Sequence, residues 1–227
     1  LLDKQLNSLN LSPNQSGKGK NVWYCMGYTL ARDKAKSVAL HDCDILTYSR
    51  EFIARLVYPV SNPLFDYEFC KGYYPRVGDN KLNGRVSRLL VTPLLKTFTK
   101  VLGHRDLIEF IDVFRYPLAG DCSFKSRLLK EIRIPSDWGL EIGLLSEMQR
   151  SQANKKICQV DIAKMYDHKH QPLSEEDSEK GLSRMSIDIS KTLIRKLAAQ
   201  GDTFTHNTLR TIKATYYRTA LDLLETY

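Results

Sequence analysis

Two carboxylates, Asp42 and Asp44, lie at the end of the run 38–44 with a single residue between them. This run predicts a short buried strand. Side chains at positions i and i+2 of a strand point to the same side, so both carboxylates can converge on one hard cation. Open α/β sheets bind their ligands at the carboxyl ends of strands, and a cation there could bridge the diphosphate of a nucleotide. The alternative is a strand-to-loop turn in which an aspartate caps the backbone.

A basic side chain at a glycine-rich position is the second candidate for phosphate chemistry. Lys18 lies between Gly17 and Gly19, and glycines let a backbone approach a phosphate closely. Its ammonium could neutralise negative charge that builds up on a departing diphosphate. The alternative is a flexible basic loop. The segment does not match the Walker pattern Gly-x-x-x-x-Gly-Lys-[Ser/Thr].

Three further residues have side chains suited to a polar site. Arg85 offers a planar fork for phosphate or carboxylate anions. Glu141 lies at the predicted start of a helix, where the helix N-terminus favours an ionised carboxylate. The alternative for Glu141 is a capping glutamate in the first turn. His168 follows a strand-like run, and a single histidine in such a place is usually only a polar residue near a turn.

The composition is that of a globular protein without a membrane span. Of the 227 residues, 42% are apolar and 26% are charged, which fits one large domain, or one domain and part of another. No run approaches the roughly 18 apolar residues that a membrane span needs. The first residues contain neither an initiator Met nor a signal-peptide hydrophobic region, so we expect the chain to start inside a longer protein.

Cysteine usage and charge narrow the expected surroundings and partners. The five cysteines are odd in number and none is paired at Cys-x-x-Cys spacing, which argues against a disulfide framework or a zinc site and favours a reducing cytoplasm. A net charge of +8 indicates either weak attraction to polyanions or a cleft that attracts phosphorylated substrates. Nucleic acid is not an expected partner, because we find no basic run with interleaved aromatics and no familiar binding motif.

The elements that must position these residues alternate between helix and strand, which predicts an α/β fold with a helical end. The predicted helices cover 21–32, 50–58, 86–102, 122–131, 140–150, 174–200 and 205–226. The predicted strands cover 38–44, 67–74, 110–118 and 158–166. Ser49 is the expected N-cap of the second helix, Asn62-Pro63 ends it, and 8–20 are expected to form a loop.

Several separated segments agree on one family. They are 17–23 (Gly-Lys-Gly-Lys-Asn-Val-Trp), the triplet 42–44, 83–87 (Asn-Gly-Arg-Val-Ser) with 93–95 (Pro-Leu-Leu), 117–120 (Pro-Leu-Ala-Gly), 138–145 (Trp-Gly-Leu-Glu-Ile-Gly-Leu-Leu) and 168–172 (His-Lys-His-Gln-Pro). In order and rough spacing, the chain resembles the retaining GT-A glycosyltransferases that make glucosyl-3-phosphoglycerate, to which the mannosylglycerate-type synthases are related.

The resemblance implies a GT-A, Rossmann-like nucleotide-sugar glycosyltransferase fold over 1–173, followed by a helical C-terminal extension over 174–227. The first strands of the family, which hold the nucleotide base, are largely missing from this sequence. The amphipathic helices after 174 could close the domain or form a dimer seam, and the family favours a homodimer.

The resemblance also implies a role for each candidate residue. Asp44 ligates Mg²⁺ or Mn²⁺ directly, Asp42 binds the ribose or the metal shell, and His168 supplies a further metal ligand. Lys18 binds the donor diphosphate and assists its departure, and Glu141 lies where the acceptor hydroxyl and the sugar meet. The implied acceptor-binding residues are Gly84, Arg85, Ser87, Trp138 and His170.

Three positions depart from the family pattern. Ser87 replaces a common threonine and keeps the hydroxyl, whereas His170 replaces an asparagine. Tyr166, or a neighbour if one residue is inserted, stands where an arginine is usual. Loss of an arginine would weaken phosphate binding, so a non-phosphorylated acceptor such as glycerate stays open.

The expected function is therefore metal-dependent transfer of a hexose from a nucleotide diphosphate sugar to a small hydroxy acid. UDP-glucose is the favoured donor and 3-phosphoglycerate the favoured acceptor, with neither nucleic acid nor a membrane as partner. The alternative is a non-catalytic remnant of the same fold that binds a nucleotide sugar or another phosphorylated metabolite.

Overall fold

The computed structural model describes residues 2–11, 17–75, 77–78, 81–82, 84–167 and 181–226. Its α-helices are α1 (Leu2–Ser8), α2 (Lys18–Arg32), α3 (Arg50–Ser61), α4 (Thr92–Leu102), α5 (Asp106–Asp112), α6 (Leu140–Ser151), α7 (Gly181–Ala199) and α8 (His206–Leu224). Its strands are β1 (Ser37–Leu40), β2 (Phe69–Tyr73), β3 (Val77–Gly78), β4 (Lys81–Leu82), β5 (Cys122–Lys125) and β6 (Ile157–Asp161). A π-helix, Ser87–Val91, precedes α4, and short 3-10 helices cover Ser126–Lys130 and Asn154–Lys156.

Four strands form a mixed sheet in the order β1-β5-β2-β6. Strand β5 is antiparallel to both of its neighbours, and β2 is parallel to β6. The residue Phe69 of β2 pairs with Phe124 of β5 and with Ile157 of β6. This mixed sheet confirms the predicted α/β class.

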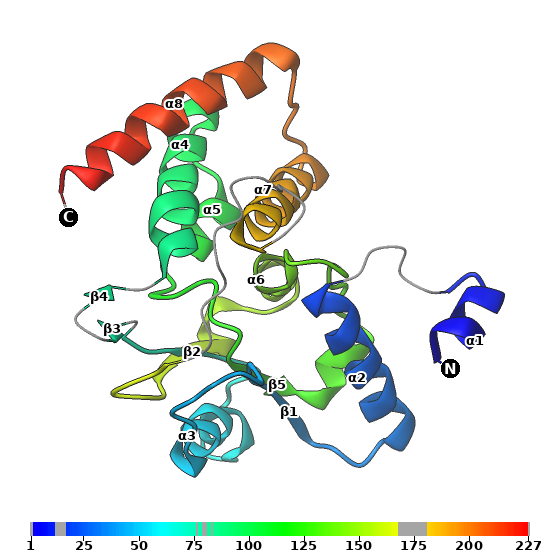
Figure 1. Ribbon diagram of the computed structural model, residues 1–227. Helices are drawn as coiled ribbons and strands as arrows, with labels where there is room; N and C mark the ends of the chain where they lie inside the picture. The colour runs from blue at the N-terminus through cyan, green and yellow to red at the C-terminus, as the bar shows by residue number, and fades with distance from the viewer. Residues whose placement is uncertain are drawn as a thin grey trace.

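The sheet separates two hydrophobic clusters, because successive side chains of a strand point to opposite faces. Phe69 and Phe124 contribute to the larger cluster, which also contains apolar residues of α4, α5, α6 and α7. Cys70 belongs to the smaller cluster, which contains Phe52 and Leu56 of α3. Figure 1 accordingly shows α3 on one side of the sheet and α4, α5 and α6 on the other.

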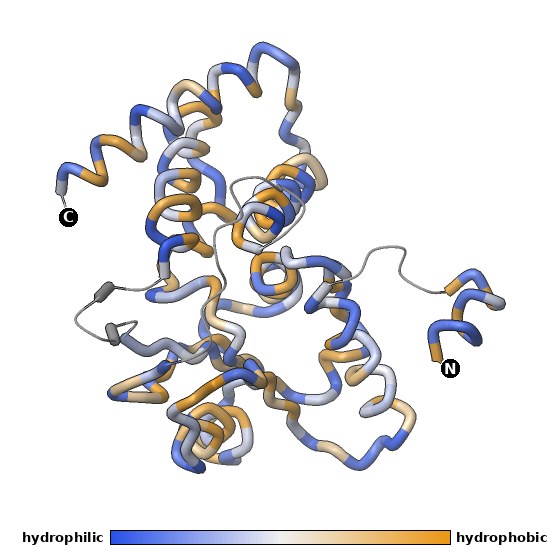
Figure 2. The backbone as a smooth tube through the Cα atoms, in the orientation of Figure 1, coloured by the Kyte–Doolittle hydropathy of each residue, from blue (hydrophilic) through white to orange (hydrophobic). Residues whose placement is uncertain are grey.

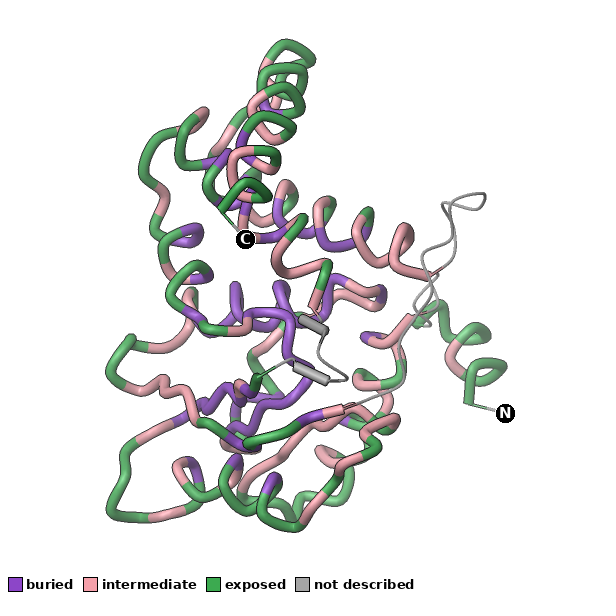
Figure 3. The backbone as a smooth tube through the Cα atoms, turned by 60° about the vertical axis from the view of Figure 1, so that its left-hand side comes forward, coloured by how far each residue is buried: buried purple, intermediate pink, exposed green. Residues whose placement is uncertain are grey.

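The C-terminal helices share the larger cluster. Ile189, Leu193 and Leu197 of α7 and Ile212 of α8 belong to it. Along α8, apolar and polar residues alternate (Figure 2), and α8 packs against α4. Figure 3 shows most of α1 and of α8 exposed, while buried residues gather in the middle of the molecule.

Side-chain caps begin two of the helices. The Ser49 hydroxyl accepts a hydrogen bond from the Glu51 amide at 3.1 Å, which confirms the predicted N-cap of α3. The Thr205 hydroxyl accepts one from the Thr208 amide at the start of α8. Within the described part of the chain, no helix combines the length and the apolar character needed to cross a bilayer.

Two predicted elements have the wrong type. The predicted strand 110–118 is the end of helix α5 and the turn after it, and Leu107, Ile108 and Ile111 are buried at helical spacing. The predicted helix 122–131 begins as strand β5 and continues as a 3-10 helix. Short apolar runs fit both periodicities, and the pairing with neighbouring strands decides between them.

Three predicted boundaries are also corrected. The strand predicted over 38–44 ends at Leu40, so Asp42 and Asp44 lie in the loop that follows it. Helix α2 begins at Lys18, inside the segment 8–20 predicted as a loop. The strand predicted over 158–166 is shorter, Ile157–Asp161.

Candidate functional site

The ammonium of Lys18 joins two carboxylates that come from distant parts of the chain. Its Nζ bonds to Asp42 Oδ1, 24 residues away, and to Glu141 Oε1, 123 residues away, at 2.7 Å for the latter. Burial by itself would lower the pKa of Lys18, but the charges of Glu141 and Asp42 outweigh this effect and raise it well above its ordinary value. Three of the residues predicted from sequence therefore form one polar cluster.

Backbone packing places Lys18 at this point. The Gly19 amide donates to the Asp137 carbonyl at 3.2 Å, and the Lys20 amide donates to the Ser136 carbonyl at 2.8 Å. These bonds satisfy amides that the first turn of a helix leaves unpaired. A Cβ at Gly17 would lie 2.8 Å from Asp137 Cα, and one at Gly19 would lie 2.9 Å from the Pro135 carbonyl carbon. The glycines on either side of Lys18 thus allow α2 to rest directly on segment 135–137.

Glu141 occupies the first turn of α6 and is only 5% exposed. The preceding turn is fixed by Asp137, whose Oδ1 accepts a hydrogen bond from the Gly139 amide at 2.9 Å. A Cβ at Gly139 would lie 2.8 Å from Thr192 Cβ, so α7 packs directly on the start of α6. Trp138, predicted to contact the acceptor, is half-buried in this turn.

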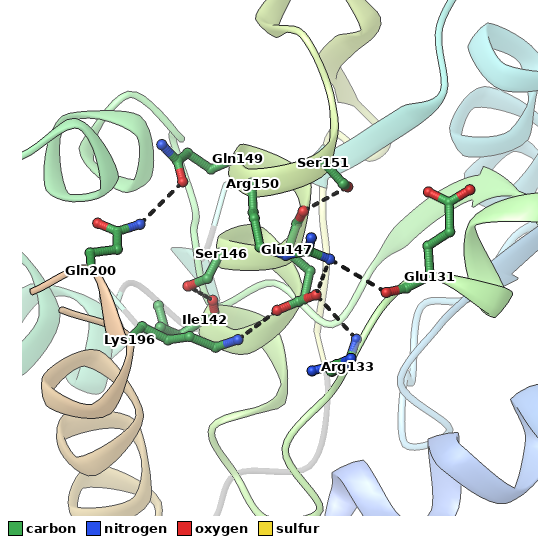
Figure 4. A network of polar contacts seen from close by, with 10 residues as sticks. All are labelled: Glu131, Arg133, Ile142, Ser146, Glu147, Gln149, Arg150, Ser151, Lys196 and Gln200. Carbon is green, nitrogen blue, oxygen red and sulfur yellow. Dashed lines mark hydrogen bonds and ion pairs between the residues drawn. The ribbon is translucent and has the colours of Figure 1, made fainter. Parts of the chain in front are cut away.

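The far end of α6 is held by a buried carboxylate, Glu147 (Figure 4). Its Oε1 accepts a hydrogen bond from Lys196 of α7 at 2.7 Å, and its Oε2 accepts one from Arg150 at 2.9 Å. The Arg133 amide donates to Oε2 at 3.2 Å. Burial would raise the pKa of Glu147, but the hydrogen bonds from Lys196 and Arg150 outweigh it and lower the pKa.

The loop after β1 carries the two aspartates. Asp42 bonds to Lys18, whereas the half-buried Asp44 makes no hydrogen bond or ion pair with any described residue. Because β1 ends at Leu40, strand alternation does not bring the two carboxylates together. Among the described residues there is no group of three His, Cys, Asp or Glu side chains that could hold a metal ion. The predicted ligand His168 and the predicted acceptor residue His170 lie outside the described residues.

Next to this loop is a polar cluster that sequence reasoning did not predict. The buried carboxylate of Asp121 accepts a hydrogen bond from the Tyr166 hydroxyl at 3.0 Å. His41 Nδ1 lies 2.6 Å from Asp121 Oδ1, although the ring is not oriented for a hydrogen bond. Tyr166 is 3% exposed and stacks on Tyr74, so it belongs to the core and not to a phosphate-binding surface.

The backbone of Ala119 and Gly120 completes the site. A Cβ at Gly120 would clash with the Asp42 carboxylate and with Lys18 Nζ, so only glycine lets both groups come this close. Lys71 of strand β2 donates a hydrogen bond from its Nζ to the Ala119 carbonyl. Lys71 was missed at the sequence level, although a lysine within the apolar strand Phe69–Tyr73 is a signal for a buried polar contact.

Three of the predicted acceptor residues, Gly84, Arg85 and Ser87, lie on the segment that leads into α4. Gly84 has φ = 84°, in the left-handed region that favours glycine. Arg85 is exposed, and the buried Ser87 hydroxyl has no hydrogen-bond partner among the described residues. Ser87 opens a π-helix, a local irregularity that is frequent at functional sites. No hydrogen bond or ion pair between described residues joins Arg85, Ser87 or Trp138 to the Lys18 cluster.

Comparison with known proteins identifies relatives of the whole chain. No protein-family model matches it. A glucosyl-3-phosphoglycerate synthase from Persephonella marina is 44% identical over 226 residues, which is 100% of this chain and 56% of the relative. The chain belongs to the glucosyl-3-phosphoglycerate synthase family. A second member, from Methanococcoides burtonii, is 42% identical over 214 residues, which is 93% of this chain and 52% of the relative. The chain thus spans about half the length of these glucosyl-3-phosphoglycerate synthases.

Solved structures of the family agree with the fold. Glucosyl-3-phosphoglycerate synthase from Mycobacterium tuberculosis, in complex with Mn²⁺, UDP-glucose and phosphoglyceric acid, aligns with a TM-score of 0.63 and 25% identity. The alignment covers 85% of this chain and 59% of that one. A complex of the same enzyme with Mn²⁺, UDP-glucose and glycerol 3-phosphate aligns with a TM-score of 0.62. These alignments confirm the predicted GT-A fold.

Proposed function

We propose that the protein transfers glucose from UDP-glucose to 3-phosphoglycerate in a metal-dependent reaction that retains the anomeric configuration. The observation that carries the proposal is the convergence of Asp42 and Glu141 on Lys18. This convergence brings together Asp42 from the acidic loop expected to bind the donor, the Lys18 ammonium, which suits a diphosphate, and the buried Glu141 carboxylate, which suits a hydroxyl. The relatives named for this activity, and the complexes of one of them with UDP-glucose and phosphoglyceric acid, support the choice of substrates.

The donor set suits Mg²⁺ or Mn²⁺. Both ions prefer oxygen ligands, and the Asp44 carboxylate has no partner among the described residues that would compete with a cation. Asp44, Asp42 and His168 would hold the ion. A bound cation would neutralise the negative charge that develops on the departing diphosphate. Solved complexes of the Mycobacterium tuberculosis relative contain Mn²⁺ or Mg²⁺.

Lys18 and Glu141 have distinct tasks in this mechanism. The acceptor hydroxyl oxygen bonds to the anomeric carbon as the bond from that carbon to the diphosphate oxygen breaks. Lys18 stabilises the charge on that oxygen, and the departing diphosphate takes up the hydroxyl proton. Glu141 is paired with Lys18 through Oε1, and its carboxylate oxygens can accept a hydrogen bond from the acceptor hydroxyl and orient it.

Acceptor binding falls to the segment before α4. Arg85 is exposed, and its guanidinium offers a planar fork for a phosphate or carboxylate. The Ser87 hydroxyl makes no hydrogen bond with any described residue, so it can bond to the acceptor. Gly84, Trp138 and His170 are proposed to line the same acceptor site. Tyr166 takes no part, because its hydroxyl is bonded to Asp121.

A transfer assay on the full-length protein tests the proposal. UDP-glucose and GDP-mannose are each combined with 3-phosphoglycerate and D-glycerate in the presence of Mn²⁺ or Mg²⁺. Asp44→Ala is the test variant, and Asp66→Ala is the matched control, because Asp66 is exposed and pairs only with Lys156 among the described residues. We expect turnover with UDP-glucose and 3-phosphoglycerate that Asp44→Ala abolishes and Asp66→Ala retains. If no combination of donor and acceptor gives product and UDP does not bind in a metal-dependent way, the transferase proposal is wrong and the protein is better described as a non-catalytic remnant of the fold.

A further inference from the structure

Lys71 is a charged residue in the middle of the sheet. It lies on β2, where its register partners are Cys122 of β5 and Gln159 of β6. It is 1% exposed, and a buried ammonium is costly unless it is paired. The described residues offer its Nζ one hydrogen-bond acceptor, the carbonyl oxygen of Ala119.

Strand β2 holds the segment 117–121 at two points. Lys71 Nζ donates to the Ala119 carbonyl, and the Gly72 amide donates to the Asp121 carbonyl at 2.9 Å. Gly120 lies between these two anchors. On its Cα, the space that a Cβ would need is taken by Lys18 Nζ and the Asp42 carboxylate. The same short piece of backbone is therefore bonded to Lys71 and packed against the two donor-side residues of the site.

We propose that Lys71 is a positioning residue for glucosyl transfer, which acts by fixing the Ala119–Gly120 backbone against which Lys18 and Asp42 are set. The kinetic part of this inference rests on the proposed function. The structural part does not, because the bond from Lys71 to Ala119 exists whatever substrate the protein binds.

The hydrogen-bonding capacity of a lysine suits this position. Burial lowers the pKa of Lys71 and the nearby Lys18 adds to the shift, which the negative charges of Glu141 and Asp121 only partly oppose. The lysine Nζ carries hydrogens in both its protonated and its neutral form, so it can donate to the Ala119 carbonyl in either form. An apolar side chain of the same length would leave the Ala119 carbonyl without its partner.

Two variants of Lys71 and one matched control test the inference in the full-length protein. Lys71→Met has a similar shape but no donor and no charge, and Lys71→Gln keeps a neutral donor. Lys125→Met is the control, because Lys125 lies on the neighbouring strand β5 and pairs with Glu68, away from the cluster. The readouts are hydrogen exchange of the peptide 117–121, the affinity for UDP with Mn²⁺, and kcat and KM separately.

In Lys71→Met we expect faster exchange confined to 117–121 and UDP affinity weaker by about tenfold, the loss of one hydrogen bond. We expect kcat to fall by about 100-fold, the usual effect of misplaced reacting groups, with KM for the acceptor nearly unchanged. Lys71→Gln should lie between Lys71→Met and the wild type, and Lys125→Met should match the wild type. If Lys71→Met does not fold, Lys71→Gln is judged by the same three readouts.

Unchanged exchange at 117–121 in the folded Lys71 variants would overturn the inference. So would a uniform rise in exchange with normal kcat and normal UDP affinity, because Lys71 would then serve only global stability. If the wild type transfers no glucose, the proposed function fails while the exchange measurement still decides whether Lys71 holds the segment 117–121.

Discussion

Two glycines of helix α2 provide a matched pair of substitutions with opposite expected effects. A Cβ at Gly19 would lie 2.9 Å from the Pro135 carbonyl carbon and closer still to its oxygen, whereas ordinary contact begins at 3.4 Å. Both groups are backbone and cannot turn aside, so the start of α2 must move away from segment 135–137 by roughly 1 Å or more. A Cβ at Gly27, in the same helix, would meet nothing within 4 Å.

The expected magnitudes follow from the contacts that Gly19→Ala would disturb. The displacement breaks the Gly19–Asp137 and Lys20–Ser136 hydrogen bonds, each worth about 1 kcal/mol, so the free energy of unfolding falls by about 2 kcal/mol. Gly27→Ala should raise it by about 1 kcal/mol, because alanine loses less backbone entropy in a helix. The two variants should therefore differ by about 3 kcal/mol, or roughly 6–12 °C in Tm.

Urea unfolding followed by circular dichroism measures this difference, and titration with UDP and Mn²⁺ measures its effect on the site. Since Lys18 precedes Gly19, we expect Gly19→Ala to weaken UDP binding and Gly27→Ala to leave it unchanged. A Gly19→Ala protein as stable as Gly27→Ala would refute the claim that α2 rests on segment 135–137.

Three further predictions concern charged groups. Glu141→Gln should lower kcat by about 100-fold, while its affinity for UDP with Mn²⁺ stays close to that of the wild type. Steady-state kinetics and calorimetry measure these two quantities. An equal loss of kcat and of UDP affinity would mean that Glu141 binds the donor and not the acceptor. Asp44→Ala should lose the metal dependence of UDP binding with Tm nearly unchanged, because its carboxylate has no described partner, and a large fall in Tm would contradict this. Glu147 has a lowered pKa in the folded protein, so its contribution to stability is present above the unfolded value of 4.5 and is lost as pH falls through the folded value. The stability advantage of the wild type over Glu147→Gln in urea unfolding should thus be larger at pH 7 than at pH 3.5, and an advantage independent of pH would exclude this linkage.

Sequence patterns predicted those elements whose periodicity or capping is unambiguous. Helix α3 begins after Ser49 as expected, and the long apolar repeats of α6 and α8 were recognised as helices. Segment 122–131 was assigned the wrong type because the pairing of β5 with β1 and β2 is a long-range property. Segment 110–118 was assigned the wrong type because a short apolar run fits the periodicity of a strand as well as that of a helix. Local sequence carries no information about which distant strands will pair.

For the site, residue types were predictable and their mutual contacts were not. Lys18, Asp42 and Glu141 were all expected in the site, but nothing in their spacing predicted that one ammonium would join both carboxylates. Gly17 and Gly19 were interpreted as a phosphate-approach motif, and the structure shows that they pack against backbone. Lys71 was missed because its partner, the Ala119 carbonyl, lies 48 residues away.

The contact of Thr192 with Gly139 makes the C-terminal segment a determinant of the geometry of the site. Helix α7 touches α6 at both ends, through Thr192 beside the turn that precedes Glu141 and through Lys196 at Glu147. A substitution on α7 that moves either contact would tilt α6 and so shift the Glu141 carboxylate relative to Lys18. Evolution or engineering could therefore tune catalysis from α7 without altering any residue that contacts a substrate.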